Sequence, residues 1–264
     1  TPMVNDIITA MADKQEKNNL KDFKVYLEEH ESELNELTSD IQYGYGFDLN
    51  IYNADVVGGI VRVNPNEILN KMGFGEMAEV QSMMGTEQMS GTTVFSPIIG
   101  GETLLNSQYE VIAGNWPQND NEVVLELDQN GNISDYTLYS LGLMDQDELV
   151  DNYNALMSGE EVKDVEEKTY TYEELLDISF KLLLNTDFYQ KENGVWVDKS
   201  SDEEYMKTVC EDALTIDVVG IVMPKESSVS GNRMGGVLYP SGLQDYVIDH
   251  VGDSEIAKEQ QENP

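Results

Sequence analysis

The spacing of apolar residues in the first part of the chain predicts helices followed by strands. From Val4 to Leu37 apolar residues recur every three or four positions, which predicts two helices or one kinked helix. From Ile41 to Ile51 they alternate with polar or small residues, which predicts a strand with one apolar face. A second strand is predicted from Val56 to Val63. Asn64-Pro65-Asn66-Glu67 then predicts a helix start capped by Asn64, and Gly73 ends that helix.

The segment from Leu104 to Leu143 has the most regular pattern in the chain. A strand is predicted from Tyr109 to Ala113, and a tight corner, Gly114-Asn115-Trp116-Pro117, follows it. After an Asn/Asp-rich loop, a second strand is predicted from Glu122 to Leu127, and a short helix is predicted to open at Ser134. This succession of elements contains no catalytic signature, so we expect it to serve the assembly of the fold.

The second half of the chain continues to mix helices, strands and hairpins. Thr171-Tyr-Glu-Glu174 predicts a capping box at a helix start, and Asn193-Gly194 predicts a tight hairpin. Because helices and strands alternate irregularly, we expect an α+β fold of mixed sheets with flanking helices. The other elements predicted here are helices at 145–157, around Cys210 and after Ser241, and strands at 178–187, 214–223 and 235–239.

The composition narrows the class of protein. A chain of 264 residues can form one large domain or two subdomains with separate cores. Its 51 acidic and 15 basic residues give a net charge of −36, which would repel a phosphate backbone and excludes nucleic acid as a partner. A solvated acidic surface on a secreted domain is the favoured explanation of this charge. Calcium binding and attraction of cationic peptides or drugs are the alternatives.

The apolar runs and the chain ends predict a piece of a longer protein. No run of about 18 apolar residues occurs, so we expect no membrane-spanning helix in this chain. The chain begins at Thr1, without an initiator Met or a signal peptide, and it ends in polar, helix-like sequence. We therefore expect a fragment cut from a larger polypeptide.

One short motif resembles a metal site. Side-chain oxygens at Asp128, Asn130 and Asn132 recur at alternate positions, as at the start of an EF-hand calcium loop. However, Ile133 stands where that loop requires Gly, and Tyr139 stands where it requires a bidentate Glu. A turn with local hydrogen bonds to Asp128 is the favoured interpretation, and the three residues are weak candidates for calcium.

The other chemistry-bearing residues form no catalytic motif. His30 and His250 fall on apolar helical stripes or their edges, and Cys210 has no predicted His partner, so structural roles are favoured. There is no Gly-x-Ser-x-Gly elbow and no phosphate-binding loop, and no pair of acids stands out for glycoside hydrolysis. Trp116 and Trp196 lie beside turns, where packing is favoured over sugar binding. We expect no enzymatic activity and no cofactor.

The methionines between Met72 and Met89 leave two interpretations open. They lie in a stretch rich in Gly, Ser and Thr. A loosely specified core or a subdomain seam is favoured over an adaptable surface for a drug or partner.

Several segments resemble those of one family of membrane proteins. Gly114 to Leu125 has the pattern G-x-x-P-x-x-x-x-E-V-V-L, and Leu141-Gly142-Leu143 follows it. Ile216 to Pro224 and Gly236 to Leu243 are similar to later segments of the same family. The family consists of the extracytoplasmic domains of ABC-transporter permeases of the macrolide-exporter (MacB-like) and FtsX type. With Phe180 to Asp187, the similar segments cover about half the chain in the expected order.

The resemblance implies a domain organisation and a place in the cell. The whole of 1–264 would form one extracytoplasmic domain, on the extracellular face of a bacterial cytoplasmic membrane. Residues 1–105 and 213–264 would form a membrane-proximal subdomain, into which a second subdomain, 106–212, is inserted. Permease domains of this type lie between the first and second transmembrane helices.

The resemblance also implies a noncatalytic role in mechanotransmission. Its expected partners are the transmembrane helices of the same permease, a cytoplasmic ABC ATPase acting through them, and a second permease copy. ATP hydrolysis would move the external domains and drive export or release of a peptide, drug or lipoprotein. An accessory protein or substrate peptide is a further expected partner. The alternative is a free extracellular binding protein or hydrolase with an acidic surface.

Overall fold

The structure is a computed structural model in which the chain divides into two compact units, Thr1–Ile41 and Gln42–Pro264. The residues that it describes are 19–34, 36–38, 41, 43–56, 59–65, 67–74, 94–163, 168–226, 228 and 235–262. In the first unit α2 (Leu20–Glu29) is followed closely by α3 (Glu31–Leu34), which confirms helical structure in the second part of the predicted Val4–Leu37 segment, while its first part lies outside the described residues. Asn19 caps α2, and the side chain accepts a hydrogen bond from the Asp22 amide.

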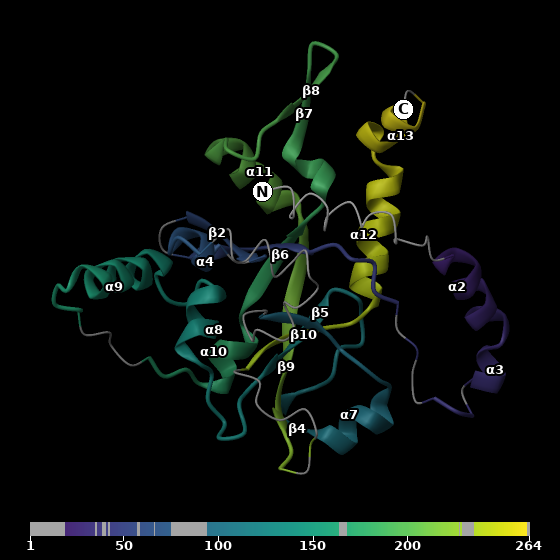
Figure 1. The fold of residues 1–264 in the computed structure, drawn as a ribbon, viewed down its shortest axis with the longest axis horizontal. Helices are drawn as coiled ribbons and strands as arrows, with labels where there is room; N and C mark the ends of the chain where they lie inside the picture. The colour runs from purple at the N-terminus through teal and green to yellow at the C-terminus, as the bar shows by residue number, and fades with distance from the viewer. Residues whose placement is uncertain are drawn as a thin grey trace, which may run out of the picture. The chain divides into compact units, whose positions relative to one another are not determined.

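The second unit is built on an eight-stranded mixed sheet (Figure 1). Its order is β2-β1-β6-β9-β5-β10-β3, and β4 also pairs with β9. The β5–β9 and β10–β3 pairs are parallel, and the other pairs are antiparallel. This confirms the predicted α+β fold. The strands are β1 (Asn50–Val56), β2 (Gly59–Asn64), β3 (Phe95–Pro97), β4 (Tyr109–Gly114), β5 (Glu122–Glu126), β6 (Ser179–Leu183), β9 (Leu214–Pro224) and β10 (Gly236–Tyr239).

The strand β9 organises the sheet because it is long enough to pair with three others. Its first residues pair with β6 up to Asp217, and its last residues pair with β4 from Gly220 onward. The strand β5 spans Asp217 to Val222 of β9 and therefore occupies the opposite edge. Ile216, Val218 and Ile221 of β9 are buried in the main apolar cluster, together with Leu243 of α12 (Gly242–Asp253). The predicted strand and its end at Pro224 are confirmed.

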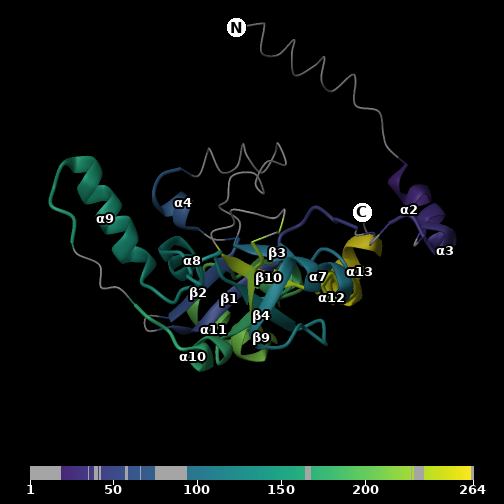
Figure 2. The ribbon, with the colours of Figure 1, turned by 90° about the horizontal axis from the view of Figure 1, so that it is seen from below.

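Helices cover the sheet and extend beyond it. The helix α10 packs on β9, and α11 packs on β6 and β1. In Figures 1 and 2, α9 projects away from the sheet, and of its residues only Gln146 and Asn152 are buried. The helices are α4 (Ile68–Lys71), α7 (Glu102–Gln108), α8 (Asp135–Ser140), α9 (Gln146–Ser158), α10 (Tyr172–Leu176), α11 (Glu203–Asp212), α12 (Gly242–Asp253) and α13 (Glu255–Glu262), with a 3₁₀ helix η1 (Asn185–Phe188).

The prediction of a strand from Ile41 to Ile51 is wrong in its bounds. Strand pairing begins only at Asn50, and the described residues from 41 to 49 are neither helix nor strand. The neighbouring strand β2 ends at Asn64, opposite Ile51, and β6 ends opposite Asn50, so both partners of β1 stop there. Gly46 also adopts φ 66°, which interrupts an extended backbone. The alternating residues indicated one apolar and one polar face, but strand formation also depends on pairing with a neighbouring strand.

The predicted helix start at Asn64 is also wrong. The Asn64 side-chain amide donates to the carbonyl of Leu49 at 2.6 Å and so links β2 to the segment before β1. The Asn64–Pro65 peptide is cis, and α4 begins at Ile68 with Glu67 as its cap. The predicted end is confirmed, because Gly73 follows the helix with φ 86°.

Other local signals are confirmed. Thr171 and Glu174 form the capping box of α10. Asn193 and Gly194, with φ 50° and 84°, join β7 (Tyr189–Glu192) to β8 (Val195–Asp198) in a separate two-stranded sheet. The predicted strand at 178–187 is shorter than expected, since β6 ends at Leu183 and η1 follows.

The eight-stranded sheet contains strands from both proposed subdomains. The strands β4, β5 and β6 belong to 106–212, and they pair with β1, β9 and β10 from the other proposed subdomain. The division into subdomains stays a prediction. Among the described residues, no helix combines the length and the apolar character needed to cross a membrane.

Candidate functional site

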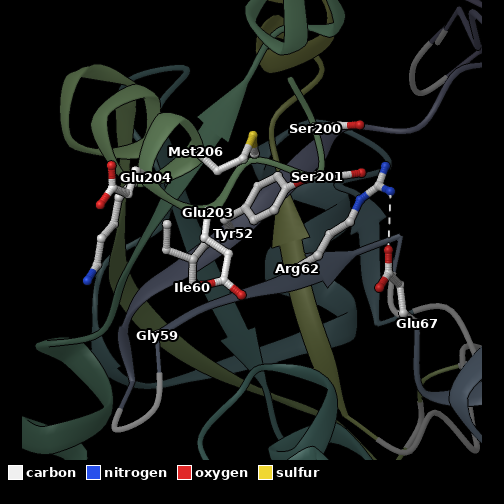
Figure 3. A pocket seen from close by; sticks show the side chains of 11 residues that line it. Tyr52, Gly59, Ile60, Arg62, Glu67, Ser200, Ser201, Glu203, Glu204 and Met206 are labelled. Atoms are coloured by element: carbon white, nitrogen blue, oxygen red, sulfur yellow. Dashed lines mark hydrogen bonds and ion pairs between the residues drawn. The ribbon is translucent and has the colours of Figure 1, made fainter. Parts of the chain in front are cut away.

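A cavity of about 450 Å³ lies between β1, β2 and the start of α11 (Figure 3). Tyr52 and Arg62 enter it from the sheet, and Glu203 and Met206 enter it from α11. The sequence alone gave no indication of this cavity, because β2 and α11 are far apart in the chain. We call it the Arg62 cavity.

The Arg62 guanidinium is held in place but is only partly paired. Its Nη2 donates to the Asn50 side-chain oxygen at 2.5 Å, and Asn50 in turn donates to the Asn185 oxygen at 2.5 Å. Its Nη1 lies 3.5 Å from a Glu67 carboxylate oxygen, a long contact for an ion pair. Among the described residues its buried Nε has no hydrogen-bond partner. Because a guanidinium has five N–H donors, several stay free for an acceptor.

Part of the wall of the Arg62 cavity is apolar and packs against a buried thiol. Tyr52, Met206 and Cys210 pack in one apolar cluster. Burial raises the pKa of Tyr52, and the Arg62 cation opposes that rise. Burial also raises the pKa of the Cys210 thiol to about 11, so the thiol is protonated at neutral pH and is a poor nucleophile. Cys210 is buried and forms no disulfide.

The weak calcium candidates form a turn. The Asp128 carboxylate accepts the backbone amides of Asn130 and Asn132, both at 2.8 Å. Partial burial by itself would raise the pKa of Asp128, but these hydrogen bonds lower it. The geometry is that of an Asx turn, as favoured from the sequence. In the described part of the chain, no group of three or more His, Cys, Asp or Glu residues is placed to hold a metal ion.

The two histidines have similar local surroundings. The Nδ1 atom of His30 lies 2.8 Å from the Tyr26 carbonyl, and that of His250 lies 2.8 Å from the Tyr246 carbonyl. Each imidazole also stacks on the tyrosine one helical turn earlier. One nitrogen of each ring is therefore engaged, as expected for a structural histidine.

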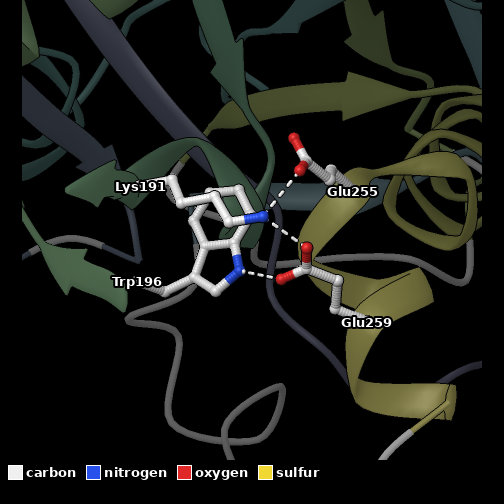
Figure 4. Close-up of polar contacts among 4 residues, drawn as sticks. All are labelled: Lys191, Trp196, Glu255 and Glu259. Carbon is white, nitrogen blue, oxygen red and sulfur yellow. Dashed lines mark hydrogen bonds and ion pairs between the residues drawn. The ribbon is translucent and has the colours of Figure 1, made fainter. Parts of the chain in front are cut away.

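A polar cluster joins the β7–β8 hairpin to α13 (Figure 4). Lys191 pairs with Glu255 at 2.7 Å and with Glu259, and it lies 5.3 Å from the centre of the Trp196 ring. The Trp196 indole N–H donates to Glu259 at 2.8 Å. Lys191 and then Trp196 lower the pKa of Glu259, and hydrogen bonds to Glu255 and Glu259 raise that of Lys191. We call this the hairpin–α13 cluster.

Sequence patterns predicted packing for both tryptophans but not this cluster. Trp116, in the corner that follows β4, packs edge-to-face with Tyr109, with ring centres 5.9 Å apart. Trp196 instead pairs with a helix far away in the sequence, and no periodicity connects the two segments. Of the methionines singled out, Met72 packs against the cluster around Ile68, and the others lie outside the described residues.

We expect Lys191→Met to loosen α13. The substitution keeps an apolar stem beside Trp196 but removes the cation shared by two carboxylates. Backbone amides of Glu255–Glu262 should then exchange hydrogen faster, while those of β9 should not change. Lys258→Met is the matched control, because Lys258 pairs with Asp253 at 3.2 Å and does not reach the hairpin. Equal acceleration in the two variants would show that the hairpin does not hold α13.

Comparison of this chain with models of protein families, with curated proteins and with solved structures found no match. A functional proposal therefore depends on the motifs of this sequence and on where the fold places them.

Proposed function

We propose that this chain is the noncatalytic extracytoplasmic domain of an ABC-transporter permease of the macrolide-exporter or FtsX type. In this role it couples ATP hydrolysis in the cytoplasm to movement outside the membrane, for export or release of a peptide, drug or lipoprotein. The support comes from the segments that resemble this family and from the contacts between them.

The observation that carries the proposal is the meeting of two motif glycines. Gly114 of the Gly114–Leu125 segment pairs with Gly220 of the Ile216–Pro224 segment, in the antiparallel pairing of β4 with β9. A Cβ atom on Gly114 would lie 2.1 Å from the Val219 carbonyl oxygen, and one on Gly220 would lie 2.2 Å from that of Asn115. The two segments therefore need glycine at these positions for the same close approach. Residues that resemble one family in sequence form one structural unit.

The other motif residues stabilise the same unit. The Glu122 carboxylate accepts the backbone amides of Gln118 and Asn119 at 2.6 and 3.1 Å, which fixes the corner after Pro117. Gly142 has φ 69° and ends α8, while Leu141 before it is fully buried. These roles concern assembly and not chemistry, as a mechanical domain requires.

The hairpin–α13 cluster supplies a route for movement. In a permease of this type both ends of the domain lead into transmembrane helices. Lys191 and Trp196 bind α13 to the hairpin, and α12 packs through Leu243 on the central sheet. A displacement of α13 would therefore be transmitted to the hairpin and to the sheet.

Labelling from outside the cell tests the location. In the full-length gene product, Glu160→Cys places a thiol at an exposed position after α9. A membrane-impermeant maleimide should label this variant in intact cells, and the parent protein is the control, since Cys210, its cysteine within residues 1–264, is buried. Labelling of Glu160→Cys only after cell lysis would contradict an extracytoplasmic location.

The neighbouring coding sequence separates this proposal from the alternative, a free extracellular binding protein or hydrolase. Apolar helices encoded on both sides of residues 1–264, with an ATPase gene nearby, would support the permease. A signal peptide and a stop codon at these positions would contradict it. Turnover of peptides or glycosides by the isolated chain would favour the hydrolase.

The pH dependence of stability tests the role assigned to Glu122. Hydrogen bonds from Gln118 and Asn119 lower the pKa of Glu122 below its usual value. The ionised carboxylate thus stabilises the fold above the pKa of the unfolded chain, and this contribution is lost as the pH falls through the folded pKa. Glu122→Gln should cost about 1 kcal/mol at pH 7 and less as the solution is acidified, measured by urea unfolding.

Glu110→Gln is the control for this measurement. Glu110 is an exposed glutamate on β4 whose side chain has no hydrogen bond within the described part of the chain. Its substitution should leave the free energy of unfolding almost unchanged at every pH. If Glu122→Gln behaved in the same way, the carboxylate would not hold the corner.

A further inference from the structure

The residues that line the Arg62 cavity carry both positive and negative charges, whereas the chain as a whole is strongly acidic. Arg62 and Lys207 line it together with Glu67, Glu203 and Glu204. Two cations therefore face three carboxylates in a protein whose net charge is −36. A free dianion such as phosphate would meet three carboxylates, and a simple cation would meet Arg62 and Lys207. The charges fit a ligand that carries both signs.

The Arg62 end of the cavity offers donors for a carboxylate. Asn50 is 6% exposed and fixes the guanidinium, whereas the Glu67 contact of 3.5 Å leaves its charge incompletely paired. The hydroxyls of Tyr52 and Ser201 form no hydrogen bond with another described residue. In Figure 3 the Ser200 and Ser201 hydroxyls lie at the same end of the cavity as the guanidinium. An arginine fork with nearby hydroxyls is a common arrangement for binding a carboxylate.

The other end and the wall suit an ammonium group and an apolar side chain. Figure 3 shows Glu204 at the end away from Arg62, and Glu203 between the two. Both glutamates are exposed, and their carboxylates accept no hydrogen bond from another described residue. Ile60 and Met206 add apolar surface between the charged ends. The volume of about 450 Å³ lies within the range of small-ligand sites.

We propose that the Arg62 cavity binds a short peptide of two or three residues with both termini free. Its carboxylate pairs with Arg62 and the hydroxyls, its ammonium pairs with Glu203 or Glu204, and an apolar side chain packs against Ile60 and Met206. This binding site is independent of the permease proposal, since the isolated chain contains the whole cavity.

Titration calorimetry of the 264-residue chain with the tripeptide Ala-Leu-Ala tests the site. The free peptide should bind, and its C-amidated and N-acetylated forms should each bind at least tenfold more weakly. Arg62→Gln should lower the affinity for the free peptide at least tenfold and make it insensitive to C-amidation, which assigns the carboxylate to Arg62. Lys225→Gln, which removes a cation outside the cavity, should not change the affinity.

A second variant distinguishes loss of peptide binding from loss of the folded state. Ser201→Ala removes no hydrogen bond within the described residues and should weaken binding of the free peptide several-fold while the unfolding midpoint stays constant. Absence of binding at millimolar peptide would overturn the proposal. Equal binding of the free and C-amidated peptides would do the same, as would inorganic phosphate binding more tightly than the peptide.

Discussion

Replacing Gly114 with alanine should destabilise the fold by about 2–5 kcal/mol. Gly114 has φ 69°, a conformation that disfavours side chains, and the new Cβ would lie 2.1 Å from a backbone oxygen of β9. The unfavourable φ and the steric overlap both contribute to this loss. A side-chain movement cannot relieve the overlap, because the contacting oxygen belongs to the backbone of β9. The free energy of unfolding of the 264-residue chain, measured in urea, would report the loss. Total stabilities of about 5–15 kcal/mol are usual, so the variant should be marginally stable.

Gly131→Ala is the control that separates strain from overlap. Gly131 has φ 79°, but a Cβ there would have no neighbour within 4 Å. It should cost about 1–2 kcal/mol, from the backbone conformation alone. Gly220→Ala should cause a loss through overlap, since its Cβ would lie 2.2 Å from the Asn115 oxygen while its φ is not positive. If all three variants lost the same small amount, the proposed contact between the motif glycines would be wrong.

Leu141→Ala should cost about 2–5 kcal/mol. Leu141 is fully buried in the main apolar cluster, and its carbonyl accepts a hydrogen bond from the Asn53 side chain at 2.9 Å. Truncating the side chain leaves a cavity where α8 meets the sheet. The same urea measurement would give this loss.

Leu143 offers a matched control within the same motif. It is only partly buried, although it contacts the same cluster. Leu143→Ala should cost less than half as much as Leu141→Ala, because less apolar area is lost. Equal costs would show that the Leu-Gly-Leu sequence does not distinguish a buried from a half-buried position.

The large predicted effects fall on residues that resemble the permease family, and their contacts explain why those residue types occur there. A glycine, a glutamate and a leucine each have a measurable structural task around β4, β5 and β9. None of these tasks requires a substrate. The Arg62 cavity lies outside these segments and depends on other residues.

The local sequence was sufficient to predict a structural element wherever the contacts that stabilise the element join residues close in the chain. The capping box of α10, the Asn193-Gly194 turn and the Asp128 turn each join residues within a few positions of one another. The strand β9 was also predictable, because a strand in the middle of the sheet is apolar along most of its length. The net charge of −36, from which we predict that nucleic acid is not a partner, is likewise a property of the sequence itself.

Tertiary structure decided the features that depend on partners far along the chain. Residues 43–49 alternate as a strand does but belong to none of the described strands, and Asn64 bonds to Leu49 when it could have capped a helix. The Arg62 cavity and the hairpin–α13 cluster likewise bring together segments that no periodicity relates. The sequence by itself thus determined the α+β class, the local turns and caps, and the acidic charge. Only folding decided which strands pair and which charged groups meet, because those energies depend on distances between residues that are remote in the chain.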